Sequence, residues 1–476
     1  MKHVVFATLL LTASVAPVQA QAPLRDPSTA PVAAPATAGS DQTLEARIAA
    51  VSDPALLTQL VARYRETGDK VAEMAALDRR IALRPHIGAY RLDKVVTLAR
   101  EDDKSQAYTN LVELQSAGYA YDLRNDERFA KIATTEVWNY LLTNLDANRA
   151  PFGEGKLVYT LPREDLLLDS LAWDSSRNEL LVGSAREGKV YRVAQDGSLE
   201  VLAAADDANE MWAVYDLAVD AKRGILWVAS TAVPHFKGYD VGKDLGRAGV
   251  FKFDLKTGKF LKSFMSPPPE AGQPHFMSSM ALGKDGEVYV ADGVNRVVYQ
   301  VRDDQFRRIL HLPMLTSIAA LAVSGDGSKL YLADPELGII GTELATLKLF
   351  DVRVPPKLTL EAINSMAWHD NALIVVQGSM SPHRVMRLGL SPQGDTIIKV
   401  QPLEASNPQF GTPGDMAMDG ATIYLVANDQ KDNYDRFGLL KSKDKLEGTR
   451  ILRLSADYAP VGSDQLGPAD FNTPDK

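Results

Sequence analysis

The sequence contains no cysteine among its 476 residues. Disulfides, zinc–thiolate sites and thiol nucleophiles are therefore excluded. The sequence also lacks a strongly basic segment, and its formal net charge is -9, so a nucleic-acid partner would find no electrostatic basis for binding. After the first residues, no segment approaches the roughly 18 uninterrupted apolar residues that a membrane-spanning helix needs. The side chains that remain for chemistry are carboxylates, hydroxyls, amides and seven histidines.

The composition is that of a folded protein, since 45% of the residues are hydrophobic and 24% are charged. A chain of this length suits two or three domains rather than one core.

Residues 1–20 have the pattern of a secretory signal, with Lys2 before the apolar run Val4–Leu11 and a small-residue cleavage site that ends at Ala20. This predicts an exported protein, periplasmic or secreted; an uncleaved N-terminal anchor is the alternative. Residues 21–40 are rich in Ala and Pro and predict a disordered linker, and residues 461–476 are assigned to a C-terminal tail.

Residues 41–150 are predicted to form an all-α domain. Apolar residues recur at helical spacing, as in Leu56, Leu60 and Tyr64, and Asp53-Pro54 and Gly68 mark the start and end of a helix. A shift of 34 residues superimposes apolar positions, and this period resembles that of the tetratricopeptide repeat. The resemblance implies a concave surface for a protein partner. The alternative is a spacer, or a cap that packs on the next domain.

A short motif recurs six times from residue 156 onward. Each copy has a polar or small residue, then Leu or Met, then Ala, and it is followed by a tight turn and a second apolar strand. The Leu or Met positions are Leu171, Leu217, Met280, Leu321, Met366 and Met416. The spacings between them are 46, 63, 41, 45 and 50 residues, which is the size of one four-stranded blade.

Residues 155–460 are therefore predicted to form an all-β six-bladed propeller, with the repeated motif as the innermost strands. The Ala of each copy fits where innermost strands crowd together near the axis. We expect Lys156–Leu161 to add the outermost strand of the last blade, beside Thr449–Leu454, and so to close the ring. Six regular copies argue against a two-sheet sandwich.

The residues just before each Leu or Met are expected to ring one mouth of the central channel. They bring together the carboxylates of Asp169, Asp216 and Asp415 with the hydroxyls of Ser278 and Ser279. Oxygen ligands of this kind suit Ca²⁺ or Mg²⁺. The simpler interpretation is that an Asp or Ser at the start of a strand turns or caps the chain.

Long loops are expected at the same mouth. One follows the second strand of blade 2 and carries His235 and Tyr239, and another contains His275. Such histidines are otherwise surface or packing residues. The last blade has a long polar insertion over residues 428–448.

The propeller motifs, among them DSLAW, YDLAVDAKRGILWVAST and MALGKDGEVYVADGVNRVVYQV, resemble the SMP-30/gluconolactonase/strictosidine-synthase-like group of calcium-dependent six-bladed propellers. The resemblance implies a calcium ion held by Asp169 and Asn364. Asn364 stands where the group has an aspartate that serves as ligand and base, and an amide cannot accept a proton in that role. Ser278 and Ala319 stand where the group has asparagines, and Ala319 cannot bind a metal.

Two hypotheses follow. The first is a lactone or ester hydrolase in which a divalent cation polarises the carbonyl, Asp216 or Asp415 is the general base, and His235 or His275 moves a proton. In that case Ser278, Ser279 and Tyr239 would contact the substrate. The second is a non-catalytic protein that binds a small ligand in the propeller and docks another protein through the helices. Neither a G-x-S-x-G motif nor a phosphate-binding glycine loop is present in the sequence.

Overall fold

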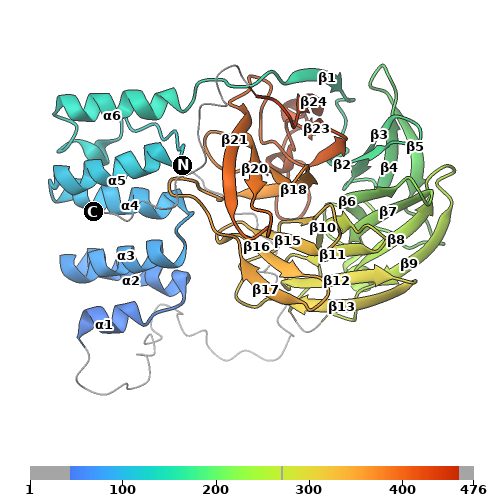
Figure 1. Cartoon of the computed structure of the whole chain (residues 1–476), viewed down its shortest axis with the longest axis horizontal. Coiled ribbons are helices and arrows are strands. Elements are labelled where there is room, and N and C mark those ends of the chain that lie inside the picture. Colours follow the sequence, from blue (N-terminus) through green and yellow to red (C-terminus); the bar gives the residue numbers. More distant parts are fainter. Residues whose placement is uncertain (1–42, 270–271, 460–476) are drawn as a thin grey trace.

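The computed structural model describes residues 43–269 and 272–459. The predicted signal peptide, linker and C-terminal tail lie outside the described residues. The chain forms a stack of helices followed by a ring of β-sheets (Figure 1). In this part of the chain, no helix has the length and apolar character needed to cross a membrane.

The first part is all-α, as predicted. Asp53 caps the helix that begins at Pro54, and Gly68 ends it with a backbone φ of 74°. The two helices of the first pair begin 34 residues before those of the second pair, at Pro54 and Lys70 against Gly88 and Lys104. The helices are α1 (Leu44–Ala49), α2 (Pro54–Thr67), α3 (Lys70–Leu83), α4 (Gly88–Arg100), α5 (Lys104–Ser116) and α6 (Glu136–Ala147), with a 3-10 turn at Glu127–Phe129.

Within residues 43–269 and 272–459, the propeller strands form six four-stranded antiparallel sheets, the blades. Blade 1 is β2 (Leu168–Asp174), β3 (Glu179–Ser184), β4 (Lys189–Val193) and β5 (Leu199–Ala204), and blade 2 is β6 (Ala213–Asp220), β7 (Ile225–Thr231), β8 (Ala248–Asp254) and β9 (Phe260–Met265). Blade 3 is β10 (Met277–Leu282), β11 (Val288–Asp292), β12 (Val297–Arg302) and β13 (Gln305–His311), and blade 4 is β14 (Ala320–Val323), β15 (Lys329–Asp334), β16 (Gly338–Glu343) and β17 (Lys348–Asp351). Blade 5 is β18 (Ile363–His369), β19 (Ala372–Gln377), β20 (Arg384–Leu390) and β21 (Ile397–Ala405), and blade 6 is β22 (Met416–Asp419), β23 (Thr422–Val426), β24 (Arg450–Ser455) and β1 (Lys156–Thr160).

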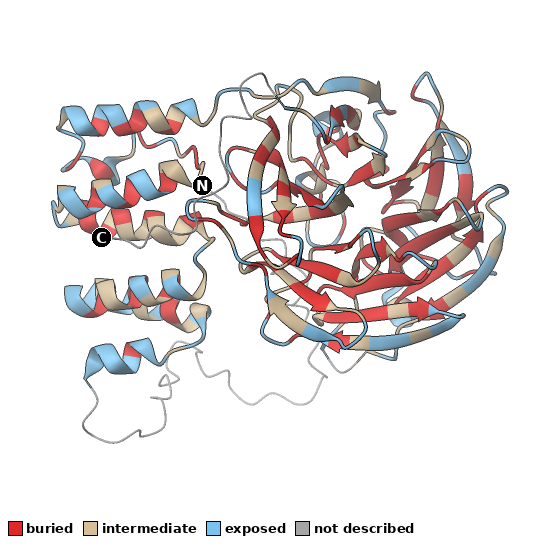
Figure 2. Cartoon of the chain, in the orientation of Figure 1, coloured by how far each residue is buried: buried red, intermediate tan, exposed pale blue. Residues whose placement is uncertain are grey.

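The ring closes as the sequence predicts. β1 pairs with β24 and is the outermost strand of blade 6. The innermost strands β2, β6, β10, β14, β18 and β22 contact one another in a closed circle. Burial is concentrated in these inner strands, whereas outer strands expose one face (Figure 2).

Each blade interlocks with the one before it through the repeated motif. The Leu or Met of one innermost strand shares a buried cluster with the Ala of the preceding blade. The pairs are Leu217 with Ala172, Met280 with Ala218, Leu321 with Ala281, Met366 with Ala322, Met416 with Ala367, and Leu171 with Ala417. The small Ala side chain therefore makes room for a large neighbour, which is a more specific reason for its recurrence than crowding at the axis.

The inner strands of four blades carry a β-bulge just before this motif. The register shifts at Asp169, Tyr215, Ser278 and Asn364 leave each of these residues without an opposite partner. A bulge bends its strand and re-aims a side chain. These four residues occupy the first ring position that the sequence predicts at the channel mouth.

The helices pack directly against blades 4 and 5. Glu361, in the loop before β18, accepts hydrogen bonds from the Tyr119 hydroxyl at 2.5 Å and from the Gly88 amide at 3.0 Å. Arg84 pairs with Glu336 at 3.0 Å. Met380 belongs to the buried core of the helical part. The helices are therefore packed on the propeller at the mouth where the bulged residues lie.

Candidate functional site

A cavity of about 1510 Å³ runs along the propeller axis. Away from the mouth, its walls are the Leu, Met and Ala side chains of the innermost strands. The mouth is formed by the bulged residues and by the loops between the second and third strands of the blades. The helical part adds Ile87, Tyr90, Tyr119 and Tyr121 to the mouth. The cavity is therefore apolar along its middle, polar at the mouth, and partly covered there by the helices. At its other end it reaches Lys284 and Ser324, in the turns that follow β10 and β14.

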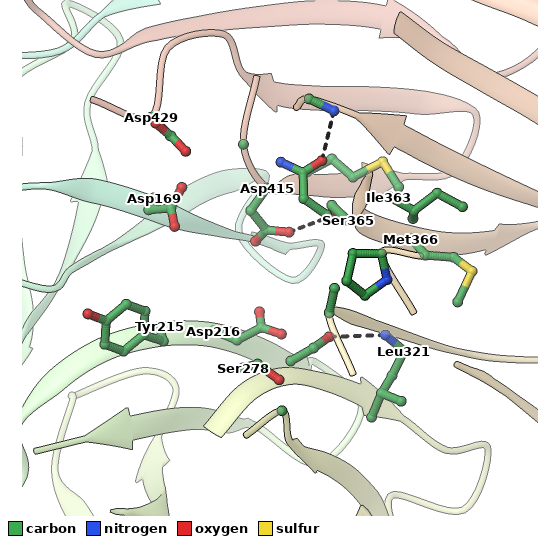
Figure 3. Close-up of a pocket in the computed structure, with 18 of the residues that line it drawn as sticks. Asp169, Tyr215, Asp216, Ser278, Leu321, Ile363, Ser365, Met366, Asp415 and Asp429 are labelled. Carbon is green, nitrogen blue, oxygen red and sulfur yellow. Dashed lines mark hydrogen bonds between the residues drawn. The ribbon is translucent and has the colours of Figure 1, made fainter. Parts of the chain in front are cut away.

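Three predicted carboxylates lie together here. Asp169, Asp216 and Asp415 all line the cavity, and they come from blades 1, 2 and 6. Figure 3 shows their side chains around one space, with Asp429 beside Asp169. Closure of the ring is what brings residues almost 250 positions apart in sequence to one point.

A lysine pairs with two of the cavity carboxylates. The Lys431 Nζ contacts Asp169 Oδ2 and lies 3.5 Å from Asp429 Oδ2. Asp169 and Asp429 are almost fully buried, with 6% and 7% of their surface exposed. Burial lowers the pKa of the Lys431 ammonium, but the nearby Asp169 and Asp429 outweigh this effect, so the pKa is raised. Among the described residues, Asp169 Oδ1 is buried without a hydrogen-bond partner. One oxygen of Asp169 is thus paired with the ammonium, and the other is a buried acceptor without a donor.

Asp216 and Asp415 join neighbouring blades. Asp216 accepts hydrogen bonds from the amides of Leu217 at 2.7 Å and Met280 at 2.5 Å. Asp415 accepts from the Leu171 amide at 3.0 Å and from the Ser365 hydroxyl at 2.7 Å, which is drawn in Figure 3. Met280 and Leu171 belong to the next blade in each case, so both carboxylates hold the ring together.

The environment shifts the pKa of these carboxyl groups upward. Burial raises the pKa of Asp415 to about 6, although its hydrogen bonds lower it. Burial, and then the nearby Asp415, raise the pKa of Asp216 well above its usual range. Burial raises the pKa of Asp429 to about 6, against the pull of Lys431. Each shift favours the protonated form relative to an ordinary aspartate. A pKa closer to neutral also makes a carboxylate a stronger base near pH 7, so the predicted role of Asp216 or Asp415 as general base stays untested.

The predicted metal ligands are engaged in other contacts. The Asn364 amide donates to the Pro413 carbonyl at 2.8 Å, and its Oδ1 accepts from the Gly378 amide at 3.2 Å. Ser278 donates to the Ile318 carbonyl at 2.7 Å. Within residues 43–269 and 272–459, no three His, Asp or Glu side chains are grouped so as to hold a metal ion. The residues present therefore do not fit a divalent cation at this mouth, and calcium binding stays a prediction.

Ser279 is placed in the predicted ring, but its hydroxyl accepts from the Leu321 amide at 3.1 Å and so joins blades 3 and 4. His235 lines the cavity, and its Nδ1 is buried without a partner in the described structure. Burial lowers the pKa of His235 to about 4, aided by Arg186 and Lys431, so its ring is neutral near pH 7.

His275 and Tyr239 are placed away from the residues that line this cavity. The His275 Nδ1 lies 2.6 Å from Asp292 Oδ2, an aspartate at the end of β11 that also accepts from the Phe276 amide. Tyr239 packs against the core of blade 2. These contacts give both residues structural partners, and their predicted roles in the site stay untested.

Sequence reasoning singled out neither Lys431 nor Asp429, although it marked the insertion that carries them. The insertion is anchored over the mouth by Arg186, which donates to the Gly438 carbonyl at 2.9 Å and to the His235 carbonyl at 2.6 Å, and pairs with Asp165 at 2.8 Å. The available signal was the Asn428-Asp429 pair shortly after β23, where the aspartate stands two residues beyond the position at which β11 and β15 end in an aspartate. The helical tyrosines gave no such signal.

Comparison with known proteins locates likeness in the propeller. The Major royal jelly protein family model matches residues 212–349, which contain most of blades 2 to 4. No curated protein matches the chain.

Among solved structures, the chain is similar to a gluconolactonase from Xanthomonas campestris, with 14% identity over 65% of this chain and 92% of that chain and a TM-score of 0.42. It is also similar to the PQQ-bound aldose sugar dehydrogenase from Streptomyces coelicolor, with 15% identity over 64% of this chain and 99% of that chain and a TM-score of 0.41. A virginiamycin B lyase from Staphylococcus aureus gives 11% identity over 63% and 99% of the two chains and a TM-score of 0.42. Likeness at this level carries no argument about activity.

Proposed function

We propose that the propeller binds a small organic molecule in the axial cavity, with its apolar body among the Leu, Met and Ala side chains and a hydroxyl group at the mouth. The observation that carries this proposal is the buried Asp169 Oδ1, which has no hydrogen-bond donor among the described residues. Leaving a buried acceptor unsatisfied costs about 1–3 kcal/mol. A ligand hydroxyl would satisfy it after a small rotation of the Asp169 carboxylate towards the cavity, and a largely apolar cavity with a few polar groups is typical of a ligand site.

A glycine offers a way to test this contact. A Cβ added at Gly414 would lie 2.7 Å from Asp169 Oδ1, so Gly414→Ala should crowd the oxygen. Gly242→Ala, in a short exposed helix, is the matched control. The measurement is the melting temperature of each variant with a panel of hydroxylated aliphatic lactones and their hydroxy acids. We expect at least one compound to raise that of the wild type and of Gly242→Ala, but not that of Gly414→Ala. A panel without effect, or equal shifts in all three proteins, would contradict the proposal.

Hydrolysis of a lactone is the second candidate, and it rests on the same oxygen. An ionised Asp169 could take a proton from a water molecule that attacks the carbonyl carbon. The ring C–O bond would then break, the alcohol oxygen would take up a proton, and a hydroxy acid would leave. Asp169→Asn should lower turnover about 100-fold or more. Binding without turnover would leave the non-catalytic alternative, in which the helices dock a protein partner.

A further inference from the structure

We propose that the Lys431 ammonium is the built-in cation of the channel mouth, in the place where the resemblance implies a divalent metal. This inference goes beyond ligand binding, and it holds whether or not the cavity takes an organic molecule. It rests on the contacts of Lys431 with two buried carboxylates and on the contacts that Asn364, the other expected metal ligand, already makes.

The Lys431 ammonium occupies the position that the resemblance assigns to the metal. The resemblance assigns the metal to Asp169, and the Lys431 Nζ contacts Oδ2 of that same carboxylate. Asp429 supplies a second carboxylate oxygen at 3.5 Å. Only 23% of the Lys431 side chain is exposed. An ammonium in contact with Asp169 excludes a metal ion from the same oxygen and already supplies positive charge there.

The other residues of the expected ligand set are engaged elsewhere or have no oxygen to offer. Asn364 uses both ends of its amide on backbone groups of the loops beside it, and Ala319 has no oxygen in its side chain. Breaking the Asn364 contacts would leave the Gly378 amide and the Pro413 carbonyl without these partners. Metal binding at Asp169 would therefore have to displace a salt bridge and disrupt the loops at the mouth.

Two buried carboxylates at the mouth share one positive charge. Asp169 and Asp429 are both buried at the cavity and both contact the Lys431 ammonium, and a buried carboxylate needs a positive partner. The insertion between β23 and β24 supplies it, and Arg186 fixes that insertion in place. The chain therefore carries its own counter-ion on the segment that covers the mouth.

The test compares how far the melting temperature depends on metal ions and how far it depends on Lys431. Melting temperatures are measured for the wild type, Lys431→Met, Lys431→Arg and the control Lys443→Met, which changes an exposed lysine of the same insertion, each with millimolar CaCl₂ and with EDTA. We expect the wild type and Lys443→Met to be insensitive to both additions. Lys431→Met should melt about 3 °C or more below the wild type, and Lys431→Arg should recover part of the loss. A Ca²⁺-dependent rise in the wild type that EDTA reverses would overturn the inference, as would a Lys431→Met variant as stable as the wild type.

If Lys431→Met does not fold, calorimetric titration of the wild type with CaCl₂ decides. No saturable binding at sub-millimolar concentration supports the inference. One-to-one binding that Asp169→Asn abolishes overturns it. The lactone panel reports separately on the cavity, so failure of ligand binding and failure of this inference are distinguishable.

Discussion

At the scale of single residues, the mouth of the channel concentrates carboxyl groups that the fold also uses for structure. Asp216 and Asp415 each accept hydrogen bonds from an amide of the next blade. These contacts lie near the propeller axis, where the same two carboxyl groups also line the cavity. One set of side chains therefore closes the ring and gives the site its polarity.

The raised pKa of Asp415 predicts how stability depends on pH. The folded protein holds this proton up to about pH 6, whereas an unfolded chain releases it near pH 4. The folded state binds more protons between these values, so its stability falls as the pH rises through the window. We expect the free energy of unfolding of the wild type, minus that of Asp415→Asn, to fall by about 1–3 kcal/mol from pH 4 to pH 7. Urea unfolding at several pH values measures it.

Asp207→Asn, at an exposed turn residue, is the control. The difference in the free energy of unfolding between the wild type and Asp415→Asn should vary with pH more than the same difference for Asp207→Asn. If both differences vary equally with pH, burial does not raise the pKa of Asp415 as described.

The sequence was sufficient to place Asp169, Asp216 and Asp415 at one mouth, because each occupies a fixed position in a repeated motif. It was not sufficient to find Lys431, because the insertion has no counterpart in the other blades and its course depends on contacts such as that of Arg186 with Gly438. The loop position of His275 suggested the mouth, whereas its ring lies against Asp292, a contact that no sequence motif predicts.

At the scale of elements, the repeated Leu or Met and Ala pair is the device that joins blades. The six pairs run around the whole ring, each linking two innermost strands. Regular spacing in sequence predicts the number of blades, and the pair explains why the motif is needed in every one. The bulges could not be predicted, because they depend on pairing with the second strand.

Enlarging one of these alanines should disturb the joint between blades. Ala322 is 3% exposed and shares its cluster with Met366, so Ala322→Leu has no room without moving the next blade. We expect a loss of about 1–3 kcal/mol in the free energy of unfolding. Chemical denaturation measures this loss, and Ala208→Leu, at an exposed turn residue, should change stability by less than about 0.5 kcal/mol. An Ala322→Leu variant as stable as this control would show that the pair leaves space between blades.

At the scale of the whole molecule, the helices belong to the cavity as well as to their own core. Tyr90, Tyr119 and Tyr121 line the same cavity as the propeller carboxylates, and Met380 of the propeller lies in the helical core. The sequence left open whether the helices form a spacer, a cap or a docking surface. Their packing at the mouth agrees with the cap, while a role in docking a partner stays a prediction.

The contact of Tyr119 with Glu361 should support this packing. Tyr119→Phe removes the donor that lies 2.5 Å from the carboxylate, and we expect a loss of about 1–2 kcal/mol in the free energy of unfolding. Tyr140→Phe, on a tyrosine of α6 that is 66% exposed, should have almost no effect. Calorimetry on both variants measures the difference. Equal stability of the two would mean that this hydrogen bond contributes nothing to the packing of the helices on the propeller.

The Lys431 ammonium, rather than a metal ion, neutralises Asp169 at the channel mouth in the arrangement proposed above. The direct measurement is a crystal structure from crystals soaked in Mn²⁺, with anomalous diffraction used to locate the ion. We expect the Lys431 ammonium to lie between Asp169 and Asp429 with no anomalous peak within bonding distance of either carboxylate. A peak on Asp169, with the Lys431 side chain displaced, would contradict the account.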